Sequence, residues 1–185
     1  MKSYLQEESL TYDGHQLSSL FAYKNFQVQG DSIVAFHGPC RVELTEMVDL
    51  EDVLAKDHIY SEAMVHFIIE HFDHDLEKAV TRQRLLVAIM AETISALGDK
   101  AVVRSGDDLY YKDRKLSVSI ATLSRVSTMI HTGLNLSSAN TPIPTISLPE
   151  LGISDWNLFA REVMARYTEE IQSIGLARCK VRGVD

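Results

Sequence analysis

The sequence has little of several features that would place it in a specialised class of protein. Only two of its 185 residues are cysteines, and Cys40 and Cys179 have neither disulfide-framework nor metal-ligand spacing. Lys and Arg number 18 against 26 Asp and Glu, a net charge of −8. This charge disfavours a broad nucleic-acid-binding surface, because phosphates are held by clustered basic residues.

Long apolar runs are also missing. No stretch approaches the ~20 residues of a membrane span, and the first residues carry acids where a signal peptide would be apolar. We therefore expect a cytoplasmic protein with no membrane partner, where thiols stay reduced. The hydrophobic share of 45% and charged share of 24% predict one globular domain over residues 1–185.

The first part of the chain has mixed signals. Aromatic residues favour a strand over 20–28, and a second strand is expected from Ile33 to Phe36, broken or bent by the proline of 37–40. A short helix is expected over 47–55. Met64, Phe67, Ile68, His71 and Phe72 recur at helical spacing, which predicts a helix that begins with Ser61 as its N-cap. Within that helix, His66 and Glu70 could share a metal, although exposed or capping roles are commoner for such residues.

The second part predicts an α+β fold with a mainly antiparallel sheet packed on helices. A long helix is expected over 76–97 and a C-terminal helix over 156–173. The proline-rich loop 137–149 is a candidate cover for a pocket. Short strands are expected at 101–104, 109–111, 115–121 and 126–136, with a closing edge strand at 177–181.

Polar residues interrupt these short strands at regular positions. By alternation, Lys115, Ser117 and Ser119 share one face of their strand, and His131 and Asn135 share one face of the next. We expect these side chains, with the turn at Asp107 and Asp108, to converge on one sheet face and form a small-molecule pocket. The backbone N–H groups of Gly30, Asp31 and Ser32 are a further candidate anion site, although a hairpin turn explains the same residues.

These motifs resemble the catalytic domain of biotin–protein and lipoate–protein ligases, a class II synthetase-like fold. The turn Ser105–Asp108 resembles the ligases' PND turn, Arg114-Lys115-Leu116 their lysine strand, and His131–Asn135 their final strand. Over nearly its whole length the chain also resembles domain of unknown function family 366. The glycine after the ligase lysine and the ligases' arginine- and glycine-rich loop have no clear match, the nearest counterpart of the loop being 28–32.

The resemblance implies roles for individual residues. Lys115 would contact an acyl carbonyl and an adenylate phosphate, with His131 as a second catalytic candidate. Asp107 and Asp108 would help to hold Mg²⁺, and ATP would be the cofactor. By their expected positions on the strands and in the 30–32 turn, Ser117, Ser119 and Asn135, with Gly30, Asp31 and Ser32, are the candidate ligand contacts.

Three functions remain open at this point. The first is an acyl or nucleotidyl transferase, and the second is a module that binds a nucleotide or small carboxylic acid without chemistry. The third is a homodimeric scaffold with no active site. Structural alternatives exist for the key residues: an ion pair with Asp108 or Asp113 for Lys115, a hydrogen-bonded core position for His131, and a solvated turn for Asp107.

Overall fold

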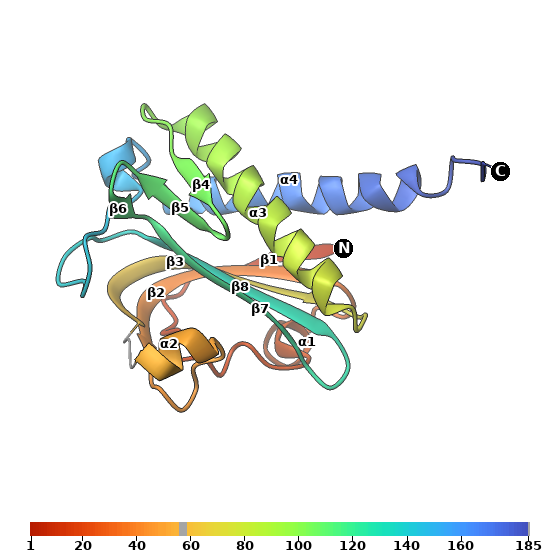
Figure 1. Ribbon diagram of the computed structural model, residues 1–185, viewed down its shortest axis with the longest axis horizontal. Helices are drawn as coiled ribbons and strands as arrows, with labels where there is room; N and C mark the ends of the chain where they lie inside the picture. Colours follow the sequence, from red (N-terminus) through yellow and green to blue (C-terminus); the bar gives the residue numbers. More distant parts are fainter. Residues whose placement is uncertain (56–58, 185) are drawn as a thin grey trace.

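The computed structural model describes residues 1–55 and 59–184 and has a five-stranded sheet at its centre. Its strand order is β1-β2-β3-β8-β7, antiparallel except for the parallel pair β1–β2. A small antiparallel sheet, β4-β5-β6, lies beside the β7 edge (Figure 1). The strand bounds are Lys2–Leu5 (β1), Ser32–Val42 (β2), Ile59–His71 (β3), Val103–Ser105 (β4), Asp108–Tyr111 (β5), Arg114–Lys115 (β6), Ser117–Leu123 (β7) and Thr128–Asn135 (β8).

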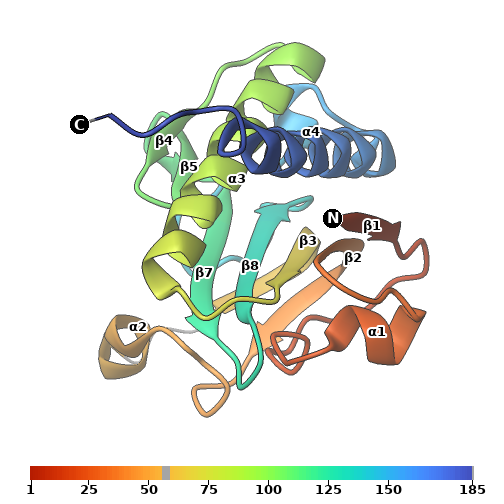
Figure 2. The same cartoon turned by 90° about the vertical axis from the view of Figure 1, so that its right-hand side faces the viewer.

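Helices cover the two faces of the main sheet unequally. The long helices α3 (Leu76–Leu97) and α4 (Trp156–Ala177) pack on one face (Figures 1 and 2). The short helices α1 (Phe21–Phe26) and α2 (Leu50–Ala55) lie on the other, and a 3₁₀ turn, η1 (Pro149–Leu151), precedes α4. The expected α+β fold with a mainly antiparallel sheet is therefore confirmed.

Both long helices begin at a side-chain cap. The Asp75 carboxylate accepts from the Lys78 N–H at the start of α3, and Asp155 accepts from two N–H groups at the start of α4. These bonds satisfy donors that the first turn of a helix leaves without partners. The predicted helix 76–97 is confirmed, and the C-terminal helix extends four residues beyond its predicted end at 173.

The main core lies between the sheet and these two helices. Val65, Phe67 and Ile69 of β3 are buried there against residues such as Leu86 of α3 and Phe159 of α4. A smaller core on the opposite face contains Phe36, Met64 and Ile68 under α1. Successive β3 residues enter different cores, because side chains alternate across a strand.

Three predicted elements were wrong. Residues 61–72 are not a helix capped by Ser61, because this stretch is the central strand β3 and pairs with β2 and β8 along most of its length. Residues 20–28 contain helix α1 rather than a strand, and its flanking residues Leu20 and Gln27 adopt left-handed backbone angles. Residues 177–181 form no edge strand, since α4 continues to Ala177.

The predicted bend at Pro39 is confirmed. β2 continues through it to Val42, with a shift of register against β3 between Gly38 and Cys40. Such a bulge accommodates a residue that cannot donate a ladder hydrogen bond.

A partly buried hydrogen-bond chain ties the residue before β2 to β3 and α4 at one end of the sheet. Asp31 Oδ2 lies 3.1 Å from His71 Nδ1, and His71 Nε2 lies 3.0 Å from the Tyr167 hydroxyl. The other Asp31 oxygen accepts from the Phe72 N–H. The hydrogen bond from His71 lowers the pKa of Asp31, and burial raises the pKa of Tyr167. This chain fixes the end of β3 to α4.

The substitution Tyr167→Phe tests this chain. It leaves His71 Nε2 buried without its partner, which costs about 1–3 kcal/mol. We expect the free energy of unfolding in urea, followed by circular dichroism, to fall by that amount. Tyr23→Phe is the matched control, because Tyr23 is about half exposed and should lose little when its hydroxyl is removed. Equal stability of the two variants would contradict the role of the chain.

Candidate functional site

A cavity of about 410 Å³ lies on the sheet face opposite the long helices and extends around the β7 edge toward β4–β6. Its walls include Tyr12, residues 46–51, the start of β3, and Thr141–Thr145 of the proline-rich loop. Lys115, Asp108, His131 and Asn135 also line it. The loop 137–149 therefore contributes a wall of the cavity, as its position suggested.

Lys115 enters the cavity from the small sheet. Its backbone pairs with Tyr110 of β5, and its ammonium lies 2.7 Å from Asp108 Oδ2. Burial raises the pKa of the Asp108 carboxyl, and the Lys115 charge opposes that shift. An ammonium has three donors, so it can meet a ligand oxygen while it keeps its carboxylate partner. The ion pair with Asp108, which was the alternative to a ligand-binding role for Lys115, is therefore formed, and both residues line the cavity.

The two predicted metal ligands are engaged by other side chains. Asp107 accepts from Arg84 through one oxygen and from Gln83 through the other, each at 2.9 Å. Asp108 is paired with Lys115. In the described ranges 1–55 and 59–184, no group of three or more His, Cys, Asp or Glu residues is arranged to hold a metal ion. These residues do not fit an Mg²⁺ site built from protein ligands.

Two buried histidines form a hydrogen-bonded pair at the cavity. His66 Nδ1 lies 3.2 Å from His131 Nε2, and His66 Nε2 lies 3.3 Å from the Gly38 carbonyl oxygen. Burial lowers the pKa of His66 to about 3 and holds the pKa of His131 well below its ordinary value. Both imidazoles are therefore neutral at pH 7.

Glycines make room for this pair. A Cβ on Gly133 would come within 3.2 Å of His66 Nδ1, and a Cβ on Gly38 would lie 2.1 Å from the Leu10 carbonyl oxygen. Gly38 thereby lets residues 10–12 run beside β2, where Tyr12 N–H donates to the Pro39 carbonyl. This path stacks the Tyr12 ring on His131, with ring centroids 3.7 Å apart.

The two predicted ligand serines lie on the other face of the sheet. Ser119 is opposite Thr132, whereas His131 is opposite Ile120, and cross-strand partners share a face. Ser119 Oγ bonds with Thr132 and Gln83, and Ser117 Oγ accepts from the Leu109 N–H. Both residues border the cavity at the β7 edge. The expectation that these serines and His131 share one face was wrong.

Asn135 lies on the His131 side of the sheet, but its side chain serves the framework. Its amide donates to the carbonyl oxygens of Lys115, at 3.5 Å, and Ile146, at 3.3 Å. These contacts bind the end of β8 to the Lys115 backbone and to the loop wall. Asn135 therefore helps to place Lys115.

Gly30, Asp31 and Ser32 are remote from this cavity. They precede or begin β2, whereas the cavity lies near the other end of that strand at Val42. An eleven-residue strand spans about 33 Å between its ends. The Asp31 carboxylate is used in the chain with His71 and Phe72. The structure does not bring this turn to the predicted pocket.

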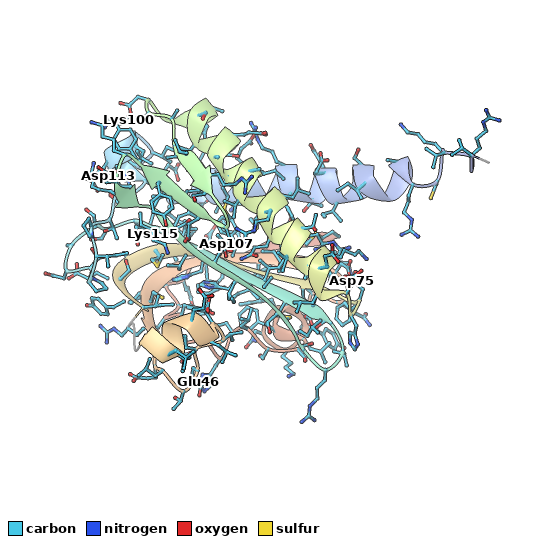
Figure 3. The ribbon with its side chains drawn as sticks, in the orientation of Figure 1. Glu46, Asp75, Lys100, Asp107, Asp113 and Lys115 are labelled. Atoms are coloured by element: carbon cyan, nitrogen blue, oxygen red, sulfur yellow. The ribbon has the colours of Figure 1, made fainter. Side chains whose placement is uncertain are left out.

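Acidic residues dominate the charged part of the described lining. Lys115 is the one Lys or Arg there, against Glu46, Asp49, Glu51, Asp107 and Asp108. Glu46 lies beside α2, away from Lys115 and Asp107 (Figure 3). A highly charged anion such as a triphosphate is therefore poorly matched by these described side chains.

Sequence reasoning missed Tyr12, the 46–51 wall and the role of His66. His66 was weighed as a metal partner of Glu70 on a helix, but Glu70 instead accepts from the Leu20 N–H and the Ser127 hydroxyl. The run Met64–Ile69 contains β-branched and aromatic residues, and this signal could have identified the strand.

No helix in the described part of the chain is both long and apolar enough to cross a membrane.

The histidine pair predicts sensitivity to acid. The folded-state pKa values lie below the ~6.5 of an unfolded chain, so the unfolded state binds protons first as the pH falls. The stability is complete above about pH 6.5 and decreases below it, by at most about 1.4 kcal/mol per pH unit for each histidine.

Urea unfolding at pH 7, 6 and 5 measures this effect. We expect His131→Gln to show a shallower fall in stability than the unsubstituted protein, because it has one such group fewer. His74→Gln is the control, since His74 is exposed and should leave the slope unchanged. An unchanged slope in His131→Gln would contradict the low pKa of His131.

Two relatives with well-matched sequences are described as uncharacterized or of unknown function. "Uncharacterized protein MJ0805" of Methanocaldococcus jannaschii is 41% identical over 174 residues, 91% of this chain and 78% of that protein. A solved protein of unknown function from Pyrococcus horikoshi is 40% identical and has a TM-score of 0.91. The match covers 100% of this chain and 99% of that one.

More distant solved structures share the fold. Biotin protein ligase from Aquifex aeolicus, in complex with biotin and ATP, is 15% identical with a TM-score of 0.63, covering 91% of this chain and 70% of that one. Ta0514 from T. acidophilum, a putative lipoate protein ligase with bound lipoic acid, is 12% identical with a TM-score of 0.54, covering 93% and 86%. The chain thus has a biotin/lipoate ligase-like fold.

The family described as "Domain of unknown function (DUF366)" matches residues 1–182. With this match over nearly the whole chain, and with relatives at 40–41% identity, the protein belongs to that family.

Proposed function

We propose that the cavity binds a small organic acid, with the Lys115 ammonium against the carboxylate or carbonyl oxygen of the ligand. The observation that carries this proposal is the Lys115–Asp108 ion pair in the cavity wall. The Lys115 side chain is 26% exposed, so its charge is partly removed from water but still accessible. A point charge in such a place attracts an oxygen anion more strongly than it would in bulk water.

The size and walls of the cavity support a small ligand. Its volume of about 410 Å³ lies within the roughly 300–1,000 Å³ of small-molecule sites. The walls combine apolar side chains such as Met64 and Val118 with a few polar groups, which is the usual composition of such sites.

Similar folds hold ligands of this kind. The Aquifex aeolicus ligase is in complex with biotin and ATP, and the T. acidophilum protein has lipoic acid bound. Biotin and lipoic acid are both small carboxylic acids. The likeness supports an acid as the ligand class, while the identity of the acid must come from this chain's own cavity.

Binding assays with defined acids test the proposal. Biotin, lipoate and straight-chain carboxylates from four to eight carbons are titrated by calorimetry, and thermal unfolding is followed in parallel. A ligand at 100 times its Kd should stabilise the protein by about 2.7 kcal/mol. We expect at least one acid to bind the unsubstituted chain and the Lys115→Ala variant to lose about 10- to 100-fold in affinity, as charged hydrogen bonds are worth about 1.5–3 kcal/mol.

Lys112→Ala is the matched control. Lys112 lies in the turn between β5 and β6, against Tyr111 and outside the cavity lining, so its loss should leave the affinity unchanged. Failure of every acid to bind, or equal losses in the two variants, would refute the proposal.

Acyl or nucleotidyl transfer is a second candidate, favoured by the placement of Lys115 on a ligase-like fold. A lysine can stabilise negative charge that develops on an acyl phosphate. The acidic lining described above opposes it, because ATP phosphates would meet one cationic side chain and several carboxylates there.

Pyrophosphate release separates the two candidates. The protein is mixed with ATP, Mg²⁺ and an acid that binds, and pyrophosphate is measured in a single turnover. Because the lining matches a triphosphate poorly, we expect no release above the enzyme-free blank. Pyrophosphate release that disappears in Lys115→Ala but persists in Lys112→Ala would show that the protein catalyses transfer rather than binding alone.

A further inference from the structure

The hydrogen bonds of the histidine pair determine which nitrogen carries each proton. The Gly38 carbonyl can only accept, so His66 Nε2 must donate to it. A neutral imidazole has one N–H, and His66 Nδ1 is therefore an acceptor. His131 Nε2 must donate to His66 Nδ1, which leaves His131 Nδ1 without a proton and with a lone pair.

His131, which carries that lone pair, lines the cavity. The residue as a whole is only 3% exposed. No residue in the ranges 1–55 and 59–184 makes a hydrogen bond to His131 Nδ1. Nor is this atom among the fully covered polar atoms without a partner, which in those ranges are His37 Nδ1, Asp108 Oδ1 and Thr168 Oγ1.

We propose that His131 Nδ1 accepts a hydrogen bond from an N–H or O–H group of the ligand. The ligand class is therefore a small acid with a second, donating group: a hydroxy, amino or amide-bearing carboxylic acid rather than a plain fatty acid. This inference rests on the proposed function for the acid end of the ligand and adds the group at its other end.

The acceptor is held in place before any ligand arrives. The Tyr12 ring stacks on the face of the His131 ring with an interplanar angle of 12°, and His66 holds the Nε2 edge of that ring by a hydrogen bond. Gly133 leaves His66 the space it needs. A preorganised acceptor costs little to use on binding. A ligand that covers it without a donor leaves a buried polar atom without a partner, and sites of this kind reject such analogues strongly.

The charges around the cavity favour the same chemistry. Most charged residues of the described lining are carboxylates, which accept hydrogen bonds and attract cations. A donor at the second end of the ligand is therefore compatible with its surroundings, whether it is neutral or an ammonium.

Matched ligands test the proposal. Straight-chain carboxylates of four to eight carbons are compared with the ω-hydroxy and ω-amino acids of the same length, each titrated by calorimetry. At the length that fits best, we expect a donor-bearing acid to bind about 10-fold more tightly than the plain acid, as one hydrogen bond is worth about 1–1.5 kcal/mol. The hydroxy and amino series distinguish a neutral from a cationic donor, and preference for either supports the proposal.

Variants then assign the preference to His131. His131→Phe should bind the plain acid at least as tightly as the unsubstituted protein does and should lose the preference, whereas the control His74→Phe should leave both affinities unchanged. A preference that survives in His131→Phe would overturn the proposal. Acids that bind with no preference at any length would overturn it while leaving the proposed function standing, and failure of all acids would overturn both.

Nuclear magnetic resonance of the unsubstituted protein tests the His131 tautomer directly, even if the His131→Phe variant does not fold. The ¹⁵N resonances of His131 should show Nε2 protonated and Nδ1 unprotonated, with Nδ1 shifting when a donor-bearing acid binds. A protonated Nδ1, or a bound hydroxy or amino acid that leaves its resonance unmoved, would contradict the assignment.

Discussion

The register of β3 between β2 and β8 is the constraint on which the rest of the structure depends. Because β3 is central, its odd-numbered residues Val65, Phe67 and Ile69 enter the core under α3 and α4, and His66 points to the opposite face. A slip of one residue would exchange these sets, placing a histidine in the apolar core and a phenylalanine beside His131. Such a slip would remove much apolar surface from the core, so the register is strongly specified. The packing of β3 under α3 and α4 therefore fixes the position of the histidine pair on the opposite face of the sheet.

The two faces of the sheet differ: one holds the main core and the other holds the cavity. The face under α3 and α4 is covered by long capped helices and holds the larger core. The face under α1 and α2 has shorter cover, so a cavity can remain there without opening the main core. Gly38 and Gly133 act on this second face, where a side chain on either would displace Leu10 or His66.

Much of the fold could be predicted from the sequence, because the periodicity of α3 and α4 and the short strands after Gly98 are local signals. β3 could not, since Met64, Phe67, Ile68 and His71 fit a helical stripe as well as a strand, and only pairing with β2 and β8 decides between them. Lys115 and Asp108 were identified as neighbours of a site, but the face of the serines was not. The chain leaves β6 at Lys115 before β7 begins at Ser117, so alternation counted through both strands could not relate Lys115 and Ser119 to His131.

The shared fold favours a nucleotide-dependent ligase, whereas the acidic cavity lining disfavours a triphosphate. The lining is the stronger guide, because it consists of this chain's own residues. A fold can support several chemistries, so likeness to ligases at 12–15% identity gives the scaffold and leaves the site to be argued from its own residues. Here Lys115 already has Asp108 as a partner, and Arg84 neutralises Asp107 from outside the lining. The local balance therefore opposes one added negative charge at Lys115 less than it opposes several. The neutral His131 acceptor extends this reasoning, because an anion or carbonyl placed against its lone pair would be repelled. The ligand that we propose, with one anionic end and one donating end, meets both of these constraints.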